Sequence, residues 1–140
     1  MKSLAQIRAT NALAACHYPA IGSGQNEGNV LSGFPQIVLN NGLLAAAASA
    51  LELNKRGELR KRGEFAVIFA LAVHLARPGV EIYRPAEALP EPPHDEKGWR
   101  QYRDTMAAFV GFLASGDGDI LRRATAETVA YLAYLKRFVA

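Results

Sequence analysis

The sequence contains few of the side chains from which disulfides and metal sites are built. It has one cysteine, Cys16, among 140 residues. A single cysteine excludes an internal disulfide and suits a reducing cytoplasm. The three histidines, His17, His74 and His94, form no Cys-x-x-Cys or His-x-x-x-His spacing, so the sequence predicts no metal and no cofactor. We interpret Cys16 as a small buried residue beside a histidine at the surface or its boundary.

Long hydrophobic runs are also missing. The longest apolar run, Phe65–Val73, ends at His74 and is far shorter than the roughly 20 residues that a membrane span needs. Near the start, Gln6, Arg8 and Asn11 interrupt any apolar segment typical of a signal peptide. The sequence therefore predicts a soluble cytoplasmic protein with no membrane partner.

Catalytic motifs are absent as well. The segment Gly22–Gly28 is rich in glycine, but it lacks the Lys-Ser/Thr pair of a phosphate-binding loop and follows a predicted helix instead of a strand. There is no Gly-x-Ser-x-Gly motif, and no two carboxylates share a helix face one turn apart. An ion pair with Arg123, four residues earlier on the same predicted helix, explains Glu127. The sequence predicts a protein that is not an enzyme.

What the sequence does contain is a set of helix-forming segments. Half of the residues are hydrophobic and 21% are charged, which is typical of a globular chain, and the length fits one domain, residues 1–140. Apolar residues recur at helical spacing in Ser3–Tyr18, Val30–Asn54, Glu64–Arg77, Trp99–Ala114 and Asp119–Ala140. The second segment is expected to break into two helices at Asn41-Gly42, because both residues accept the left-handed conformation that ends helices. The fold class is therefore predicted to be all-α, a compact bundle of five to six helices.

The other segments are interpreted as the centre and the connections of this bundle. Glu64–Arg77 is apolar nearly all the way round and belongs at the centre. Read as a strand, it would have no second strand-like run to pair with. Ala20–Asn29 contains three glycines and is predicted to be a flexible loop. Pro78–Gly98 holds five of the seven prolines and is predicted to form a long extended connection, either ordered or in part disordered.

Positive charge is concentrated in two places. The first is Lys55–Arg62, a predicted connector that carries five of the 16 basic residues, namely Lys55, Arg56, Arg60, Lys61 and Arg62. The second is the outer face of the C-terminal helix, formed by Arg122, Arg123, Lys136 and Arg137. Such clusters can neutralise the phosphates of a nucleic acid, but runs of charge are also commonly solvated faces, so the residues alone leave binding open. Because Tyr134 is the one aromatic residue near the basic arc of the C-terminal helix, any contact is expected with the nucleic-acid backbone instead of the bases.

The opposite face of the C-terminal helix is apolar and is predicted to enter the core. Its members are Ile120, Leu121, Ala124, Thr128, Tyr131, Leu132, Leu135, Phe138 and Val139. Asp117 and Asp119 precede or open this helix, where carboxylates cap amide groups. The Thr125 hydroxyl is expected to bond to the carbonyl of Leu121. One helix is thus expected to build the core on one side and to present four cations on the other.

Two stretches together resemble a known family. Residues 34–43, Phe-Pro-Gln-Ile-Val-Leu-Asn-Asn-Gly-Leu, contain a proline, a hydrophobic pair and Asn-Gly-Leu. Residues 121–138 begin with Leu-Arg-Arg-Ala-Thr-Ala-Glu and end with Tyr-Leu-Ala-Tyr-Leu-Lys-Arg-Phe. Both stretches resemble the small all-α subunit of the type III-B CRISPR effector, the fifth subunit of the Cmr complex.

This resemblance implies a non-enzymatic subunit in antiviral defence. In that family, copies of the small subunit stack along the effector filament beside the catalytic backbone subunits and help to form the channel for the guide–target duplex. The implied partners are other Cmr subunits, neighbouring copies, guide RNA and target RNA. The implied RNA contacts are Arg122, Arg123, Lys136 and Arg137, followed by the Lys55–Arg62 connector. The alternative is a helical adaptor whose basic faces meet acidic protein partners and never RNA.

Overall fold

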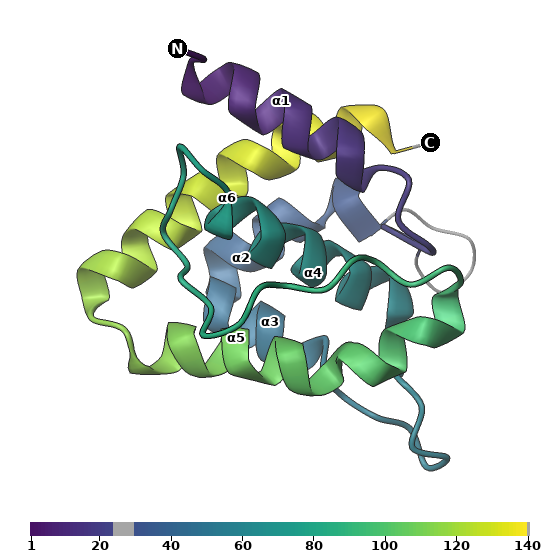
Figure 1. Ribbon diagram of the computed structural model, residues 1–140. Helices are drawn as coiled ribbons and strands as arrows, with labels where there is room; N and C mark the ends of the chain where they lie inside the picture. Colours follow the sequence, from purple (N-terminus) through teal and green to yellow (C-terminus); the bar gives the residue numbers. More distant parts are fainter. Residues whose placement is uncertain (24–29, 140) are drawn as a thin grey trace.

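The regular structure of the described chain is helical. The computed structural model describes residues 1–23 and 30–139. Its helices are α1 Leu4–Ala15, α2 Phe34–Asn41, α3 Leu43–Ser49, α4 Arg62–Ala76, α5 Arg103–Ser115 and α6 Gly118–Phe138, with short 3-10 helices η2 Val30–Ser32 and η3 Glu96–Tyr102 (Figure 1). The prediction of an all-α bundle is confirmed. Of the predicted loop Ala20–Asn29, residues 24–29 lie outside the described residues.

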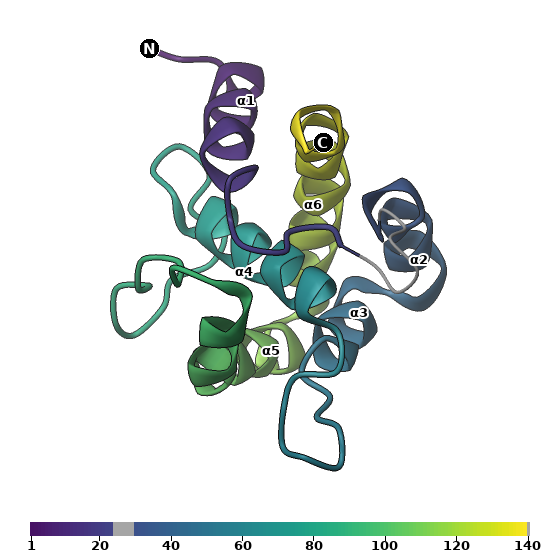
Figure 2. The same ribbon diagram turned by 90° about the vertical axis from the view of Figure 1, so that its right-hand side faces the viewer.

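Helix α4 lies at the centre of the bundle, in contact with α1, α5 and α6 (Figures 1 and 2). Its residues from Phe65 to Ala72 are all buried, which explains why this segment has no polar face. The fully buried ring of Trp99 packs against Phe65 and Phe69, at centroid distances of 5.8 and 5.1 Å. The prediction of a central helix is confirmed. Among the described residues, even this helix does not combine the length and apolarity that a membrane crossing requires.

Helix α1 begins where the segment Ser3–Tyr18 predicts a helix, but it ends earlier than predicted. Ser3 and Gln6 form a reciprocal capping box, in which each backbone N–H donates to the side chain of the other, at 2.8 and 3.2 Å. The helix ends at Ala15 instead of Tyr18. The ring of Tyr18 packs edge-on against Phe69 with a centroid distance of 5.8 Å. The earlier end agrees with the proline that follows Tyr18, because a proline disfavours helical geometry in the residue before it.

The predicted break between α2 and α3 is confirmed and falls at Gly42. Its φ is +90°, a conformation that glycine adopts at little cost. Helix α3 is shorter than predicted, since it ends at Ser49, well before the end of the segment Val30–Asn54. The Asn54 N–H donates forward to the Glu58 carbonyl at 2.8 Å, so it is not available for a helical hydrogen bond. The buried alanines of α3 allow α5 and α6 to contact it.

The proline-rich segment is an extended connection tied to the core. The N–H groups of Ile82 and Tyr83 both donate to the Leu75 carbonyl oxygen, at 2.9 and 3.0 Å. The buried ring of Tyr83 packs against Phe109 and Phe112 at centroid distances of 5.0 and 4.9 Å. These contacts hold Ile82 and Tyr83 of this segment against the core.

The helix predicted over Trp99–Ala114 begins differently from the prediction. Residues 96–102 form the 3-10 helix η3, which is capped by Asp95 through a 3.1 Å hydrogen bond from the Gly98 N–H to Oδ1. Helix α5 starts only at Arg103. A 3-10 turn at the start of a helix is common, and the hydrophobic spacing alone does not distinguish it from an α-helical turn.

Candidate nucleic-acid interface

Helix α6 separates an apolar inner face from a basic outer face. Its start is fixed by Asp117, whose Oδ1 accepts a hydrogen bond from the Ile120 N–H at 2.9 Å. The predicted inner face is buried at Ala124, Thr128, Tyr131, Leu132 and Leu135. Ile120, Leu121 and Val139 are half-buried, and Phe138 is 36% exposed. These four were predicted to be core residues, and they are less covered because they lie in the terminal turns of the helix.

The outer face of α6 carries the four predicted cations, Arg122, Arg123, Lys136 and Arg137, and all four are exposed. Arg122 contacts Asp119 at 3.3 Å, with the two side chains 80% and 68% exposed. An ion pair this exposed is worth at most about 1 kcal/mol. The side chains of Arg123, Lys136 and Arg137 form no ion pair with any described residue. At 100° per residue the four lie on one side of the helix, spread over about 20 Å of its axis.

The ion pair predicted between Glu127 and Arg123 is wrong. Glu127 is 7% exposed and lies on the inner side of α6. Its carboxylate accepts two hydrogen bonds from Arg8 of α1, from Nε to Oε2 and from Nη2 to Oε1, both at 2.7 Å. Arg123 points to solvent instead. The predicted bond from the Thr125 hydroxyl to the Leu121 carbonyl is confirmed at 2.8 Å.

His74 completes this buried cluster from the central helix α4. Its side chain is fully buried, with Nε2 at 2.9 Å from Oε2 of Glu127 and Nδ1 at 2.9 Å from the Asn11 amide nitrogen. A neutral imidazole satisfies both contacts, because Nε2–H donates to the carboxylate and Nδ1 accepts from the amide. The ring also stacks on Tyr131, with a centroid distance of 4.1 Å. The cluster therefore joins α1, α4 and α6.

The charges in this cluster follow from burial and pairing. Burial lowers the pKa of His74, against the smaller opposing effect of its hydrogen bond to Glu127. Burial alone would raise the pKa of Glu127, but the hydrogen bonds from Arg8 and His74 outweigh it and hold that pKa below its usual value. The hydrogen bond to Glu127 also raises the pKa of Arg8. The result is a charged Arg8–Glu127 pair beside a neutral His74.

This cluster uses its polar atoms to hold helices together. In the described ranges, 1–23 and 30–139, there is no group of three or more His, Cys, Asp or Glu side chains that could hold a metal ion. The sequence contains the signals that would have indicated the cluster. Arg8 and Asn11 lie one turn apart on the predicted first helix, and His74 interrupts an otherwise apolar helix.

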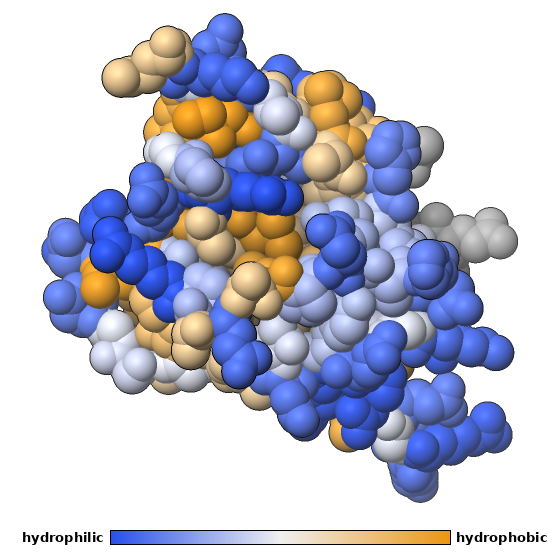
Figure 3. Space-filling view, viewed as in Figure 1, coloured by the Kyte–Doolittle hydropathy of each residue, from blue (hydrophilic) through white to orange (hydrophobic). Residues whose placement is uncertain are grey.

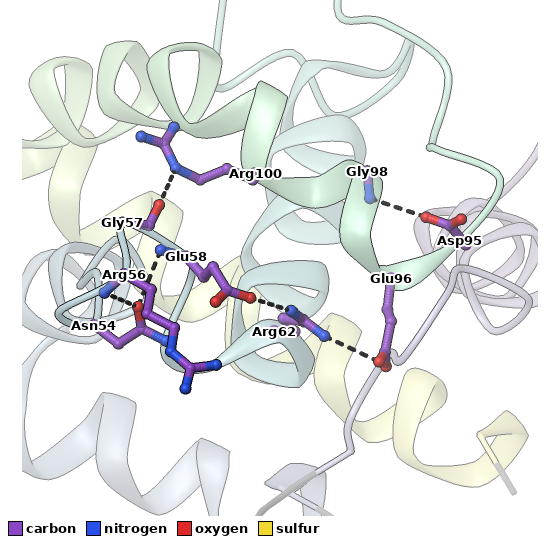
Figure 4. A network of polar contacts seen from close by, with 9 residues as sticks. All are labelled: Asn54, Arg56, Gly57, Glu58, Arg62, Asp95, Glu96, Gly98 and Arg100. Carbon is purple, nitrogen blue, oxygen red and sulfur yellow. Dashed lines mark hydrogen bonds and ion pairs between the residues drawn. The ribbon is translucent and has the colours of Figure 1, made fainter.

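In the second basic region, the connector Lys55–Arg62, some cations interact with other side chains of the protein, whereas others have no ion pair with the described residues. Arg60 contacts Glu52 at 3.5 Å, and Lys61 donates to the Ser49 hydroxyl at 2.7 Å. Figure 4 shows Arg62 between two carboxylates, those of Glu58 at 3.2 Å and Glu96 at 3.0 Å. These three residues, which were predicted to contact RNA, therefore interact partly or wholly with other side chains of the protein. By contrast, the side chains of Lys55 and Arg56 form no ion pair within the described chain.

The two basic regions lie in different parts of the molecule. In Figures 1 and 2 the connector projects from the lower end of the bundle, whereas the last turns of α6 lie at the upper end. The first turns of α6 lie at the left side of Figure 1, away from the connector at the lower right. Figure 3 shows the projecting part as a mainly hydrophilic surface. The structure therefore does not bring the two predicted clusters together into one patch.

These features define a small all-α protein that is held together by a central apolar helix and a buried charge cluster. It presents exposed cations on its last helix, three of which form no ion pair with the described residues. The family model described as CRISPR-associated protein (Cas_Cmr5) matches residues 4–140. Because the match covers nearly the whole chain, the chain belongs to the Cmr5 family and is a CRISPR-associated subunit of the Cmr complex. The resemblance drawn from residues 34–43 and 121–138 is confirmed. Comparison with curated proteins and with solved structures found no match.

Proposed function

We propose that this chain is a non-catalytic structural subunit of the type III-B Cmr effector, which stacks along the filament and contacts the backbone of the guide–target RNA through the outer face of α6. The observation that carries the proposal is the row of exposed cations on α6 in a member of the Cmr5 family. Its proposed partners are the catalytic backbone subunit, neighbouring copies of itself, guide RNA and target RNA, in the cytoplasm.

The electrostatics of α6 support contact with phosphates. Arg123, Lys136 and Arg137 lack an internal carboxylate among the described residues, so their charge remains available to a partner. Each phosphate that a cation neutralises releases counterions, which makes binding favourable and dependent on salt. Tyr134, which borders the basic outer face of α6, is half-buried. We therefore propose backbone contact instead of base recognition.

The buried cluster supports a structural role. In this cluster of Arg8, His74 and Glu127, the pKa values of His74 and Glu127 are both lowered. Shifted pKa values can mark catalytic groups. Here all three side chains satisfy one another across three helices, away from the basic outer face. We therefore assign them to stability and assign RNA cleavage to other subunits of the complex.

Co-purification tests the membership and the assembly. The tagged chain is expressed in its own host and recovered at moderate salt, and the bound proteins and RNA are identified. We expect the other Cmr subunits together with short guide RNA. The same experiment is repeated with the variant that lacks the cations of the outer face of α6. If this variant is still recovered with the Cmr subunits, and the complex binds RNA with unchanged affinity, the result would support the protein adaptor instead.

The RNA contact is tested by changing Arg122, Arg123, Lys136 and Arg137 to Ala. With a 20-nucleotide single-stranded RNA as probe, we expect the slope of log K against log salt to fall by up to about 3, since each lost contact removes about 0.7. A matched control changes four exposed cations elsewhere, Lys2, Arg77, Arg84 and Lys97. It removes the same charge, so an equal loss of affinity in both variants would contradict a contact located on α6.

A further inference from the structure

Two segments far apart in the sequence meet at the projecting end of the bundle. They are the loop of residues 52–60 and the segment of residues 96–103, which contains η3 and the start of α5. The Nε of Arg100 donates to the Gly57 carbonyl oxygen at 2.7 Å, and the Nε of Arg103 donates to the Leu51 carbonyl oxygen at 2.7 Å. Figure 4 shows Arg100 reaching the tip of the loop from η3.

The 52–60 loop has a fixed backbone conformation. An antiparallel bridge joins Leu53 to Leu59, and the Gly57 N–H donates to the Asn54 carbonyl at 3.0 Å. The Asn54 side chain caps the tip, because its Oδ1 accepts from the N–H groups of Arg56 and Glu58 at 2.8 and 3.1 Å. Gly57 has a φ of +77°, which other residues adopt with strain. A ligand that binds this tip therefore does not have to order it first.

The charge at the tip is not neutralised from within the described chain. Lys55 and Arg56 are exposed, and neither side chain has an ion-pair partner in ranges 1–23 and 30–139. Arg100 donates to the carbonyl oxygen of Gly57, which carries no net charge, so its guanidinium keeps its positive charge. The carboxylates of this region are already directed elsewhere, Glu52 to Arg60 and Lys61, and Glu58 and Glu96 to Arg62.

We propose that Lys55, Arg56 and Arg100 form a second phosphate-backbone contact, separate from α6, and that Arg60, Lys61 and Arg62 mainly hold the loop in place. This inference rests on the proposed function and deepens it by dividing the connector into contact residues and supporting residues. Arg100 lies outside both basic clusters of the sequence and joins the contact through the fold. Its planar guanidinium, held through Nε, keeps its two terminal nitrogens for a phosphate, a geometry suited to bidentate binding.

The test uses the full chain and the same 20-nucleotide single-stranded RNA. The triple variant Lys55→Ala, Arg56→Ala, Arg100→Gln is expected to lower the slope of log K against log salt by about 2, and Arg100→Gln alone by about 0.7. Two controls are matched to it. Lys2→Ala, Arg77→Ala, Arg84→Ala removes the same charge elsewhere. Glu52→Gln, Arg60→Gln removes the ion pairs of Glu52 with Arg60 and Lys61 without changing net charge. Both controls are expected to leave the slope nearly unchanged, and circular dichroism is expected to show the same helicity in every variant.

The outcomes separate this inference from the proposed function. If the α6 variant loses RNA binding but the triple variant matches its equal-charge control, the second contact is overturned and the proposed function stands. If the unaltered chain shows no salt-dependent RNA binding, both are overturned. If the triple variant loses a protein subunit from the assembled Cmr complex while its RNA slope is unchanged, the tip faces an acidic protein and the inference is overturned.

Discussion

The inner and outer faces of α6 differ in how their charged side chains are stabilised. On the inner face, Glu127 is almost fully buried and is bonded to Arg8 and His74. On the outer face, Arg123, one turn earlier, is exposed and has no ion pair with the described residues. Burial explains the difference. A charge removed from water must be paired within the protein, whereas an exposed charge is stabilised by solvent and stays free for a partner. The inner charges therefore stabilise the fold, whereas the outer charges are the ones that we propose to contact RNA.

The largest expected effect is a difference in the free energy of unfolding between a variant of the inner face and a variant of the outer face. Glu127→Ala leaves Arg8 without its carboxylate inside the protein, and we expect a loss of about 3 kcal/mol in the free energy of unfolding. Arg123→Ala, the matched change on the outer face, is expected to stay within about 0.5 kcal/mol of the unaltered chain. Urea unfolding followed by circular dichroism measures both. Equal losses would show that burial does not distinguish the two faces.

A smaller effect is expected from acid. The unfolded chain protonates His74 near pH 6.5, whereas burial lowers the pKa of His74 in the fold, so below pH 6.5 the unfolded state binds more protons. Stability is therefore expected to fall as the pH decreases from 7.5 to 5. The lowered pKa of Glu127 adds a loss in the same direction below pH 4.5.

The control for this pH dependence is His74→Gln, which retains a polar side chain but cannot titrate. The exposed histidines His17 and His94 remain in both proteins. We expect the melting temperature of the variant to be lower at pH 7.5 but to change less between pH 7.5 and 5. An equal pH dependence in the two proteins would mean that His74 is not the group responsible.

The smallest expected effect concerns an inner polar group without a partner. The Thr128 hydroxyl is buried and has no hydrogen-bond partner in the described structure, in contrast to Glu127 beside it. Thr128→Val replaces this hydroxyl with a methyl group of similar size, and we expect it to be neutral or to stabilise the protein by up to about 1 kcal/mol. A loss above 1 kcal/mol in urea unfolding would indicate that the hydroxyl has a partner.

The features that the sequence predicted best depend on near neighbours in the chain. The cap at Asp117 and the break at Gly42 are determined by a few consecutive residues. The central position of α4 follows from the composition of one segment. The exposure of the α6 cations follows from the helical period together with one apolar face.

The features that the sequence did not predict depend on distant residues. Periodicity places Glu127 near the edge of a helix face, but it cannot reveal a partner in Arg8, which is 119 positions away. In the same way, five basic residues in the connector look equivalent until the fold brings Glu96 to Arg62 and Arg100 to Gly57. The sequence could thus indicate α6 as the candidate site, but it could not separate the cations of the connector that pair within the protein from Lys55 and Arg56.

We propose that the outer cations of α6 contact RNA in the assembled complex. Ultraviolet crosslinking of the Cmr complex to its guide–target RNA, followed by mass spectrometry of the crosslinked peptides, locates such contacts. We expect crosslinks from this chain within residues 118–138. Crosslinks confined to α1, α2 or the proline-rich segment, or none to this chain in an intact complex, would contradict it.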